Sequence, residues 1–216
     1  MADFELDCFS ESGNAYKVAL MLELCGADWK VNRVAFFSGE TRSPAFRARN
    51  VMAEAPVLVH HRPGGDFTLS QSGAILNYLA AHFGKFGAES EDEKYEILRW
   101  LFWDNHKLTS YTATYRFQTF FLKKIDAVAE FFQARAKTAW KTLDTHLSDH
   151  DFLVGNRPTI ADFSVCAYLL WPDQIGMDRK DYPHIAAWLG RIEALPGFKR
   201  AEDLMPTGQE PATATA

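Results

Sequence analysis

The first eighty residues alternate between the hydrophobic periods of strands and helices. Phe4, Leu6 and Cys8 alternate with acidic residues, which predicts a strand with one buried face. Apolar residues then recur at helical spacing up to Gly26, and a glycine there is typical of a helix end. The same reasoning predicts these further elements: strands at 29–32 and 56–59, a short helix opened by Ser43-Pro44, a hairpin turn at 63–66, a strand at 67–69 and a helix capped by Ser72.

This order of elements is a βαβ unit followed by a hairpin and a last helix, and a thioredoxin-like arrangement is its simplest match. The composition changes over 84–90, which predicts a linker, and beyond it the apolar residues keep only a helical period. The expected fold class is therefore α+β, with a thioredoxin-like α/β domain over 1–83 and an all-α helical bundle over 91–205. The tail over 206–216 lacks apolar periodicity and is predicted to be disordered.

A capping box marks one helix start in the second half. Thr159 is expected to cap the helix, and Asp162 is expected to return a hydrogen bond to the backbone N–H of Thr159. This pattern is a folding signal and not a catalytic one.

Charge and cysteine content narrow the classes of partner. The 216 residues include 23 Lys and Arg against 28 Asp and Glu, so the net charge is −5, with no basic block to hold a phosphate backbone. Residues 1–5 lack the basic and apolar pattern of a signal peptide, and no apolar run reaches the roughly 20 residues of a membrane helix. Cys8, Cys25 and Cys166 are widely spaced, which suits a reducing compartment. We expect a cytoplasmic protein with neither a nucleic-acid nor a membrane partner.

Aromatic residues make up 14% of the chain, and many follow residue 95. Trp103 lies in the run Trp100–Asp104, and Tyr111 and Tyr115 share a helical face. Core, pocket and interface are all rich in aromatic side chains, so three roles stay open: plain core, a pocket for an apolar ligand, or a dimer contact.

Two short segments carry polar chemistry in the first half. The Ala55-Pro56 bond precedes a strand, where a proline can be cis. Gln71 and Ser72 stand where a strand turns into a helix, and the free N–H groups of a helix start can hold a carboxylate. The alternative is that Ser72 serves only as an N-cap.

Cysteine and histidine chemistry is disfavoured elsewhere. Cys8 alternates inward on a strand, which predicts a core residue and not a nucleophile. His60 and His61 are neighbours on a strand, so their side chains point to opposite faces. His146 and His150 have the spacing of two metal ligands, but no third ligand is evident, and a solvated face is expected. We therefore predict no metal.

Five segments, taken together and in this order, resemble the glutathione S-transferase superfamily. They are the serine-rich turn before Tyr16–Val18, Ala55–Leu58, Gln71–Ala80, Gly155–Asp162 and Tyr182–Leu189. The resemblance covers nearly the whole chain. It implies a thioredoxin-like glutathione-binding domain, an all-helical domain that supplies the second-substrate pocket, here Trp103, Tyr111 and Tyr115, and assembly as a homodimer.

The resemblance also implies the catalytic group. Ser12 falls where serine-type transferases carry the hydroxyl that faces the glutathione sulfur, Asn14 falls where some bacterial relatives use an asparagine, and Ser10 ranks second to Ser12. A free thiol has a pKa near 8.5, so hydrogen-bond donation and a helix N-terminus would favour its thiolate. That thiolate would attack a small hydrophobic electrophile.

Glutathione-binding residues follow from the same resemblance. The backbone of Ala55, before Pro56, would pair with the cysteinyl part of glutathione. Gln71 and Ser72 would form the γ-glutamyl site, and Arg42 would contact the glycine carboxylate.

The chain departs from the family pattern at several positions. Residues 50–56 lack the usual Pro and Gly, Thr41 replaces a frequent histidine, and Gln71 replaces a common glutamate whose charge would pair an ammonium. Asp104 is a candidate to reach the γ-glutamyl ammonium across a dimer.

Three functions are compatible with these residues. The first is a glutathione transferase, the second a glutathione-dependent disulfide reductase or peroxidase, and the third a non-enzymatic binding or scaffold module such as those fused to translation factors. Retention of Ser12, Gln71 and Ser72 together disfavours the scaffold, because a scaffold has no need of a carboxylate site.

Overall fold

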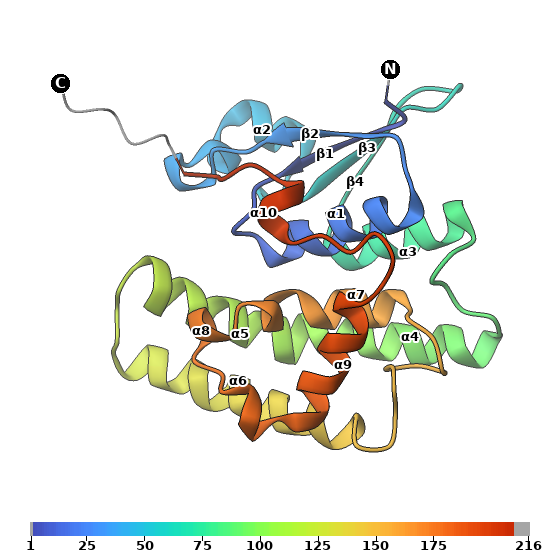
Figure 1. Ribbon diagram of the computed structural model, residues 1–216. Helices are drawn as coiled ribbons and strands as arrows, with labels where there is room; N and C mark the ends of the chain where they lie inside the picture. Colours follow the sequence, from blue (N-terminus) through green and yellow to red (C-terminus); the bar gives the residue numbers. More distant parts are fainter. Residues whose placement is uncertain (1, 210–216) are drawn as a thin grey trace. The chain divides into compact units, whose positions relative to one another are not determined.

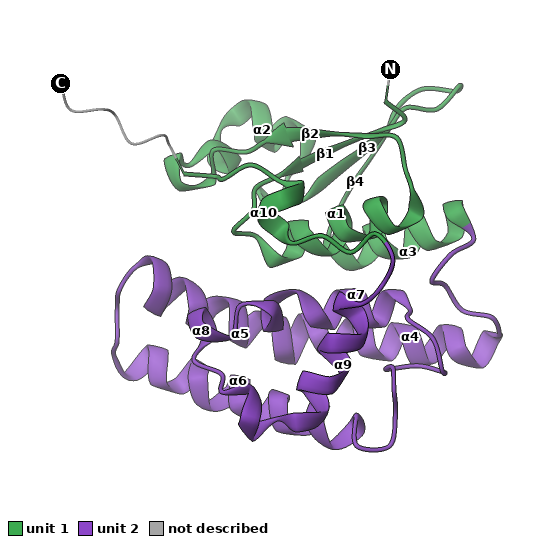
Figure 2. Ribbon diagram, viewed as in Figure 1, with its two compact units in different colours: residues 1–83, 197–216 green, residues 84–196 purple. Residues whose placement is uncertain are grey.

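The computed structural model describes residues 2–209 and divides the chain into two compact units (Figure 1, Figure 2). Unit 1 comprises Met1–Phe83 together with the chain from Gly197 on, and unit 2 comprises Gly84–Pro196. Unit 1 combines a sheet with helices, and unit 2 is helical, which confirms the predicted fold class.

Unit 1 is built on one four-stranded sheet with the order β2-β1-β3-β4. The strands are β1 (Phe4–Cys8), β2 (Trp29–Arg33), β3 (Val57–His60) and β4 (Phe67–Ser70). β1 runs parallel to β2 and antiparallel to β3, so that Leu6 pairs with Val31 on one side and Leu58 on the other. β3 and β4 form the predicted hairpin. This mixed sheet is the thioredoxin-like arrangement expected from the element order.

The helices of unit 1 pack on this sheet, with α1 and α3 on the same face (Figure 1). They are α1 (Gly13–Cys25), α2 (Pro44–Arg49), α3 (Ser72–Phe83) and α10 (Ala201–Leu204), with short 3-10 turns η1 (Phe36–Ser38) and η2 (Glu40–Arg42). α1 ends at Gly26, whose φ of 71° is the left-handed geometry that glycine adopts without a steric penalty. Most residues of α1 are buried, so this helix forms the centre of the unit 1 core.

The C-terminal segment after residue 196 returns to unit 1, whereas the sequence placed the helical domain at 91–205. The Tyr16 hydroxyl donates to the Lys199 carbonyl (2.7 Å), and the Ser10 N–H donates to the Pro206 carbonyl (2.8 Å). Hydrogen bonds therefore hold residues 206–209, which are not disordered as predicted. The bonds involve backbone groups, so the spacing of apolar side chains could not predict them. The rest of the predicted tail, 210–216, lies outside the described residues.

Unit 2 contains no strand in the part of it that the structure describes. Its elements are α4 (Glu91–Trp103), η3 (Asp104–Leu108), α5 (Thr109–Arg116), η4 (Phe117–Phe121), α6 (Ala127–His146), α7 (Ile160–Cys166), η5 (Ala167–Leu170), α8 (Pro172–Ile175), η6 (Arg179–Asp181) and α9 (Pro183–Glu193). The segments η3 and η4 have π-helical geometry: η3 continues α4 into α5, and η4 extends the end of α5. Trp140 and Trp188 are fully buried, so part of the aromatic surplus is core.

The start of α7 carries the predicted capping box. The carboxylate of Asp162 accepts from the Thr159 N–H (2.8 Å) and the Thr159 hydroxyl (3.1 Å). It also accepts from the Leu153 N–H and the Trp188 indole N–H, both at 2.9 Å. Asp162 is fully buried, so four donors surround a carboxylate that water does not reach.

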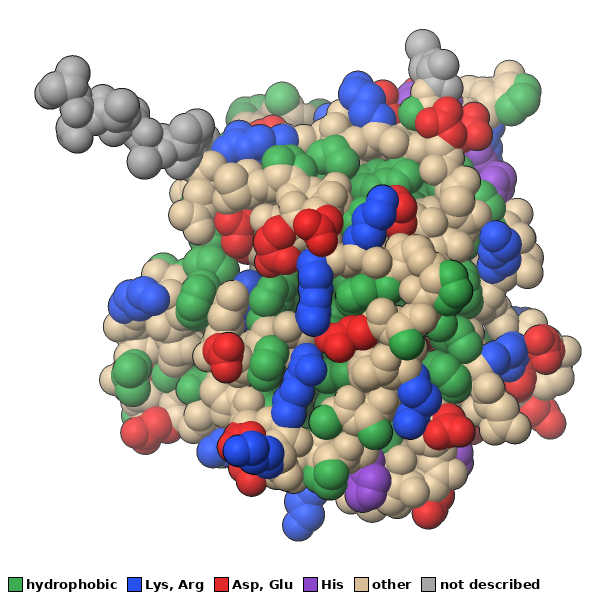
Figure 3. Space-filling model, in the orientation of Figure 1, with side chains coloured by type: hydrophobic (Ala, Val, Ile, Leu, Met, Phe, Trp, Pro, Cys, Tyr) green, Lys and Arg blue, Asp and Glu red, His purple; other side chains and the backbone are tan. Residues whose placement is uncertain are grey.

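Surface features agree with the composition. Acidic and basic side chains are interspersed on the face drawn in Figure 3. Among the helices within residues 2–209, none is long and apolar enough to cross a membrane.

Candidate functional site

The turn between β1 and α1 places two of the three predicted sulfur ligands. Ser12 is the N-cap of α1, and its Oγ accepts from the Ala15 N–H (3.1 Å). This bond uses the hydroxyl as an acceptor, so the Ser12 O–H proton stays available to a ligand. Ser10 differs, because its hydroxyl donates toward the Glu11 carboxylate at 3.5 Å and its N–H is bound to Pro206. The geometry favours Ser12 over Ser10 as a donor.

Asn14, the third predicted sulfur ligand, joins the starts of two helices. Its Oδ1 accepts from the hydroxyl of Ser72 at 3.4 Å, and the two residues are 58 positions apart in the chain. The Nδ2 group of Asn14 has no acceptor among the described residues, and its side chain is half-buried. A polar ligand at the start of α3 would therefore meet an amide donor from α1.

The start of α3 is open. The helix begins at Ser72 itself, so this serine is not the N-cap that the sequence predicted, and its hydroxyl donates to Asn14. Within residues 2–209, no acceptor is found for the backbone N–H groups of Ser72, Gly73 and Ala74. Three free donors and the positive end of the helix dipole make this position suited to a carboxylate.

The bend before Pro56 is the third segment of the candidate site, after the starts of α1 and α3. The Ala55-Pro56 bond is cis, as the sequence suggested. Asn50 is buried and holds the bend, because its amide donates to the Glu54 carbonyl (2.7 Å) and its Oδ1 accepts from the Met52 N–H (3.1 Å). Ala53 has a φ of 57°, in the left-handed region that glycine occupies more easily.

Glu54 is a site residue that the sequence reasoning missed. The Gln71 amide donates to the Glu54 carboxylate at 2.9 Å and contacts the sulfur of Met52 at 3.1 Å. Gln71 itself has a φ of 70°. Glu54, hydrogen-bonded to Gln71, thus supplies the negative charge that Gln71 lacks. The only available signal was an acidic residue two positions before the proline.

Arg42 lies in η2 and is exposed. Its guanidinium makes no ion pair or hydrogen bond with the part of the chain that the structure describes. Thr41, in the place of the frequent histidine, is buried. Arg42 is therefore a free cation, although no described contact joins it to the starts of α1 and α3.

The cysteines offer no nucleophile. Cys8, Cys25 and Cys166 are all buried and none of them forms a disulfide, and Cys8 lies in the core as predicted. Burial raises the pKa of the Cys8 thiol to about 12, so it stays protonated at neutral pH.

The histidines do not gather around a metal. His60 bonds Tyr78 and His61 bonds Asp66, in keeping with opposite faces of the strand. His146 is partly buried and stacks on His150 with ring centres 4.1 Å apart, so the solvated face predicted for this pair is wrong for His146. No group of three His, Cys, Asp or Glu side chains within residues 2–209 is placed to hold a metal.

Asp104 is not available to a ligand. It is fully buried in unit 2, where it accepts from the hydroxyls of Thr109 and Ser164, both at 2.6 Å. The suggestion that it reaches an ammonium across a dimer is therefore wrong. Asp104 instead serves as a buried hydrogen-bond acceptor for two hydroxyls of unit 2.

The three predicted pocket aromatics pack within unit 2. Trp103 meets Trp100 edge to face at 5.2 Å. Tyr111 faces Phe132 of α6, with ring centres 6.3 Å apart, and the Tyr115 hydroxyl accepts from Gln133 (2.9 Å), also on α6. Tyr111 and Tyr115 thus share a helical face, as predicted, and that face lies toward α6.

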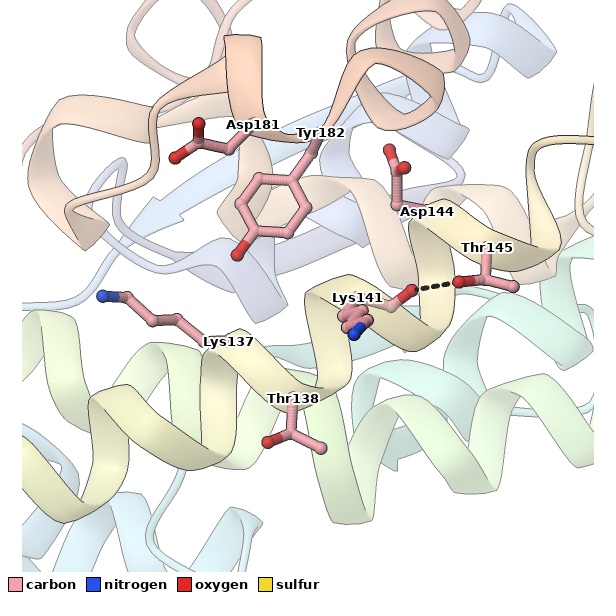
Figure 4. Close-up of a pocket in the computed structure, with 7 residues that line it drawn as sticks. All are labelled: Lys137, Thr138, Lys141, Asp144, Thr145, Asp181 and Tyr182. Carbon is pink, nitrogen blue, oxygen red and sulfur yellow. Dashed lines mark hydrogen bonds between the residues drawn. The ribbon is translucent and has the colours of Figure 1, made fainter.

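A hollow of about 520 Å³ opens elsewhere on unit 2, between α6 and the η6–α9 junction (Figure 4). Lys137, Lys141 and Tyr182 are among its lining residues, none of which belongs to unit 1. It was not anticipated from the sequence.

Comparison with known proteins adds family information. The model of the glutathione S-transferase N-terminal domain matches residues 5–81, and that of the C-terminal domain matches residues 114–196. The disulfide-bond oxidoreductase YfcG of Escherichia coli K12 is 28% identical, over 89% of this chain and 92% of the relative.

Two solved structures are similar in fold over nearly their whole length. A glutathione S-transferase from Pseudomonas fluorescens Pf-5 has a TM-score of 0.86 and 30% identity, with 93% of this chain and 99% of that chain covered. The transferase URE2P8 from Phanerochaete chrysosporium, solved with oxidized glutathione, has a TM-score of 0.85 and 25% identity, with 94% and 95% covered.

Proposed function

Because the chain belongs to the glutathione S-transferase superfamily, we propose that it is a glutathione transferase that activates the glutathione thiolate for attack on small hydrophobic electrophiles. The observation that carries the proposal is the bond between Ser72 and Asn14. This bond sets the open start of α3, suited to a carboxylate, beside the start of α1, where donors for a sulfur lie.

Each part of glutathione has a proposed partner in unit 1. The γ-glutamyl carboxylate binds the open N–H groups at the start of α3 and accepts from the Ser72 hydroxyl, whose one proton turns from Asn14 to the ligand. The γ-glutamyl ammonium binds the pair formed by Gln71 and Glu54. The backbone of Ala55, before Pro56, pairs with the cysteinyl part, and Arg42 takes the glycine carboxylate.

Thiolate formation is the chemical task of the turn before α1. Lowering a thiol pKa of about 8.5 by roughly two units requires about 2.7 kcal/mol. One charge-assisted hydrogen bond from Ser12 or Asn14 and the dipole of α1 together supply energy of this order. The thiolate then forms a carbon–sulfur bond, and the electrophile's leaving group departs with the electron pair. We assign Trp103, Tyr111 and Tyr115 to the apolar second substrate.

Calorimetric titration with reduced glutathione, followed by turnover of a chloronitrobenzene, tests the proposal. We expect Ser12→Ala to lower turnover at least about tenfold with a modest loss of glutathione affinity, because one charge-assisted bond is lost. Asn14→Ala tests the second donor in the same way. Ser148→Ala, an exposed serine of unit 2, is the matched control. Unchanged turnover in both Ser12 and Asn14 variants would remove these residues from the mechanism, and absence of glutathione binding would favour a scaffold.

Glu54 allows a sharper test of the binding mode. We expect Glu54→Gln to weaken glutathione binding by up to about fivefold, as for one exposed ion pair. A glutathione analogue that lacks the amino group should bind the wild type and the variant alike. Equal losses for both ligands would mean that Glu54 does not contact the ammonium.

A disulfide reductase is the second candidate, favoured by the similarity to YfcG. Because the Cys8 pKa is raised to about 12, no thiol of this turn serves as nucleophile. Two glutathione molecules would be oxidised: one thiolate attacks the substrate disulfide, and the second resolves the mixed disulfide, so that two substrate thiols leave. Turnover of hydroxyethyl disulfide without turnover of chloronitrobenzene would select this reaction.

We further propose that the chain is a cytoplasmic homodimer. Three buried cysteines that form no disulfide support a reducing compartment, and the exposed side chains of Tyr95 and Phe102 on α4 support a second copy as partner. Sedimentation equilibrium tests the dimer, and a monomer at micromolar concentration would contradict it.

A further inference from the structure

The hollow on unit 2 presents two cations that the protein leaves unpaired. Lys137 and Lys141 lie four residues apart on α6, so both extend from the same helical face. Neither ammonium group has an ion-pair or hydrogen-bond partner among residues 2–209. Two like charges on one face repel each other, and a bound anion would relieve this repulsion.

The acidic residue closest to them in sequence is engaged elsewhere. Asp144 accepts from the backbone N–H groups of His184 and Ile185, both at 3.0 Å, and from the His184 ring (2.9 Å). Its charge therefore stabilises the start of α9. Asp181 is the second acidic lining residue, and its carboxylate has no hydrogen-bond or ion-pair partner in the described chain, so it disfavours an anion at its own edge of the hollow.

Tyr182 supplies a ring and a neutral donor above these lysines. Its ring meets the buried Trp140 edge to face at 5.8 Å, which fixes its orientation. Figure 4 shows the hydroxyl directed toward α6, between Lys137 and Lys141, and it has no hydrogen-bond partner in the described residues. Burial, followed by the charges of Asp181 and Asp144, raises the Tyr182 pKa, so the phenol remains a donor at neutral pH.

We propose that this hollow is a binding site for a small aromatic organic anion. Its anionic group lies between Lys137 and Lys141 and accepts from the Tyr182 hydroxyl, and its ring packs against the Tyr182 ring. A volume of about 520 Å³ falls within the usual range for small-molecule sites. Because both lysines are solvent-exposed, the affinity is modest, and Asp181 orients the anion toward α6.

Phenyl phosphate is the probe, titrated into the full chain by calorimetry. Inorganic phosphate, with the charge but no ring, and phenol, with the ring but no charge, are the matched ligands. The test variant is the double substitution Lys137→Ala with Lys141→Ala. The control is Lys107→Ala with Lys124→Ala, which removes the same charge from exposed lysines of unit 2 outside the hollow. Alanine is well tolerated in helices and all four lysines are exposed, so we expect both variants to fold.

The proposal predicts saturable binding of phenyl phosphate that weakens roughly tenfold in the test variant and less than about twofold in the control. Tyr182→Phe, which keeps the ring, should weaken it a few-fold, and both matched ligands should bind more weakly than phenyl phosphate. Glutathione affinity should stay unchanged in the test variant, which separates this site from the one in unit 1. Absence of saturable binding, equal losses in test and control variants, or equal affinity for inorganic phosphate would each overturn the proposal.

Discussion

The starts of two helices, one in each unit, are built for different purposes. At α7 the carboxylate of Asp162 and the hydroxyl of Thr159 satisfy the first backbone donors, and both residues are fully buried. At α3 the donors of Ser72, Gly73 and Ala74 have no acceptor within the described residues. Closing a helix start contributes to the stability of the fold, whereas leaving it open keeps a partial positive charge for a ligand.

The residues that surround the two helix starts also differ in how far apart they lie in the sequence. The partners of Asp162 are packed against it with no space for solvent, and the sequence pattern that encodes them is local. The open start of α3 is instead supported by Asn14 and Glu54, which come from distant parts of the chain. We infer that a substitution at the closed start changes stability first, and one at the open start changes binding first.

Asp162→Ala breaks the closed start and has the largest expected effect. Four buried donors lose their acceptor, and each unsatisfied buried group costs about 1–3 kcal/mol, so the free energy of unfolding should fall by at least about 3 kcal/mol. Chemical denaturation followed by circular dichroism measures it. Asp149→Ala, at an exposed residue, is the control and should stay within about 0.5 kcal/mol of the wild type. A loss as small as that of the control would show that the box is not stabilising.

Ser72→Ala probes the open start and should move binding more than stability. Loss of one hydrogen bond to a charged carboxylate weakens glutathione binding about tenfold. The bond to Asn14 is long, so the free energy of unfolding should change by less than about 1 kcal/mol. Calorimetry and denaturation of the same variant give both values. A variant that unfolds more easily but binds glutathione normally would reverse the comparison.

Ala53→Gly sharpens the comparison at the bend before the cis-proline. A left-handed alanine costs about 1–2 kcal/mol, whereas glycine adds about 0.4–1 kcal/mol of backbone entropy to the unfolded chain. The net expectation is a gain of roughly 0.5–1 kcal/mol in the free energy of unfolding. Ala48→Gly in the exposed part of α2 should instead destabilise the protein. Destabilisation by both substitutions would show that Ala53 carries no strain.

Two histidines extend the comparison to pH without any substitution. The hydrogen bond to Asp66 raises the His61 pKa in unit 1, and burial lowers the His146 pKa in unit 2. His61 therefore favours the folded state at low pH and loses this effect as pH rises through its folded pKa. His146 favours it above its unfolded pKa, near 6.5, and loses the effect as pH falls. NMR titration should place the pKa of His61 above 6.5 and that of His146 below it. Two pKa values on the same side of 6.5 would contradict this expectation.

Local patterns predicted most of the elements. The strand at Phe4–Cys8, the helix end at Gly26 and the capping box at Thr159 all rest on residues within a few positions of one another, and all three are confirmed. The helical period predicted beyond the linker was less informative about individual residues: the apolar Ile125 precedes α6 and is 84% exposed. The spacing of apolar residues predicts a helix, but it does not show which of these residues another element buries.

The candidate site was predicted only in part. Ser12 and Asn14 came from the family resemblance, whereas Gln71 and Ser72 were also indicated by the predicted helix start; the roles of all four toward glutathione stay predictions. Glu54 was missed, because its relation to Gln71 depends on a 17-residue separation that the hairpin closes.

The sequence by itself determined the elements, the boundary near Gly84 and the reciprocal cap of α7, because each depends on short-range periods and hydrogen bonds. Only the tertiary structure decided that Ser72 donates to Asn14, that the chain from Gly197 returns to unit 1 and that Lys137 and Lys141, near Tyr182, find no partner among the described residues. These features depend on which distant segments meet. The packing of helices and strands sets those meetings, and no local pattern records them.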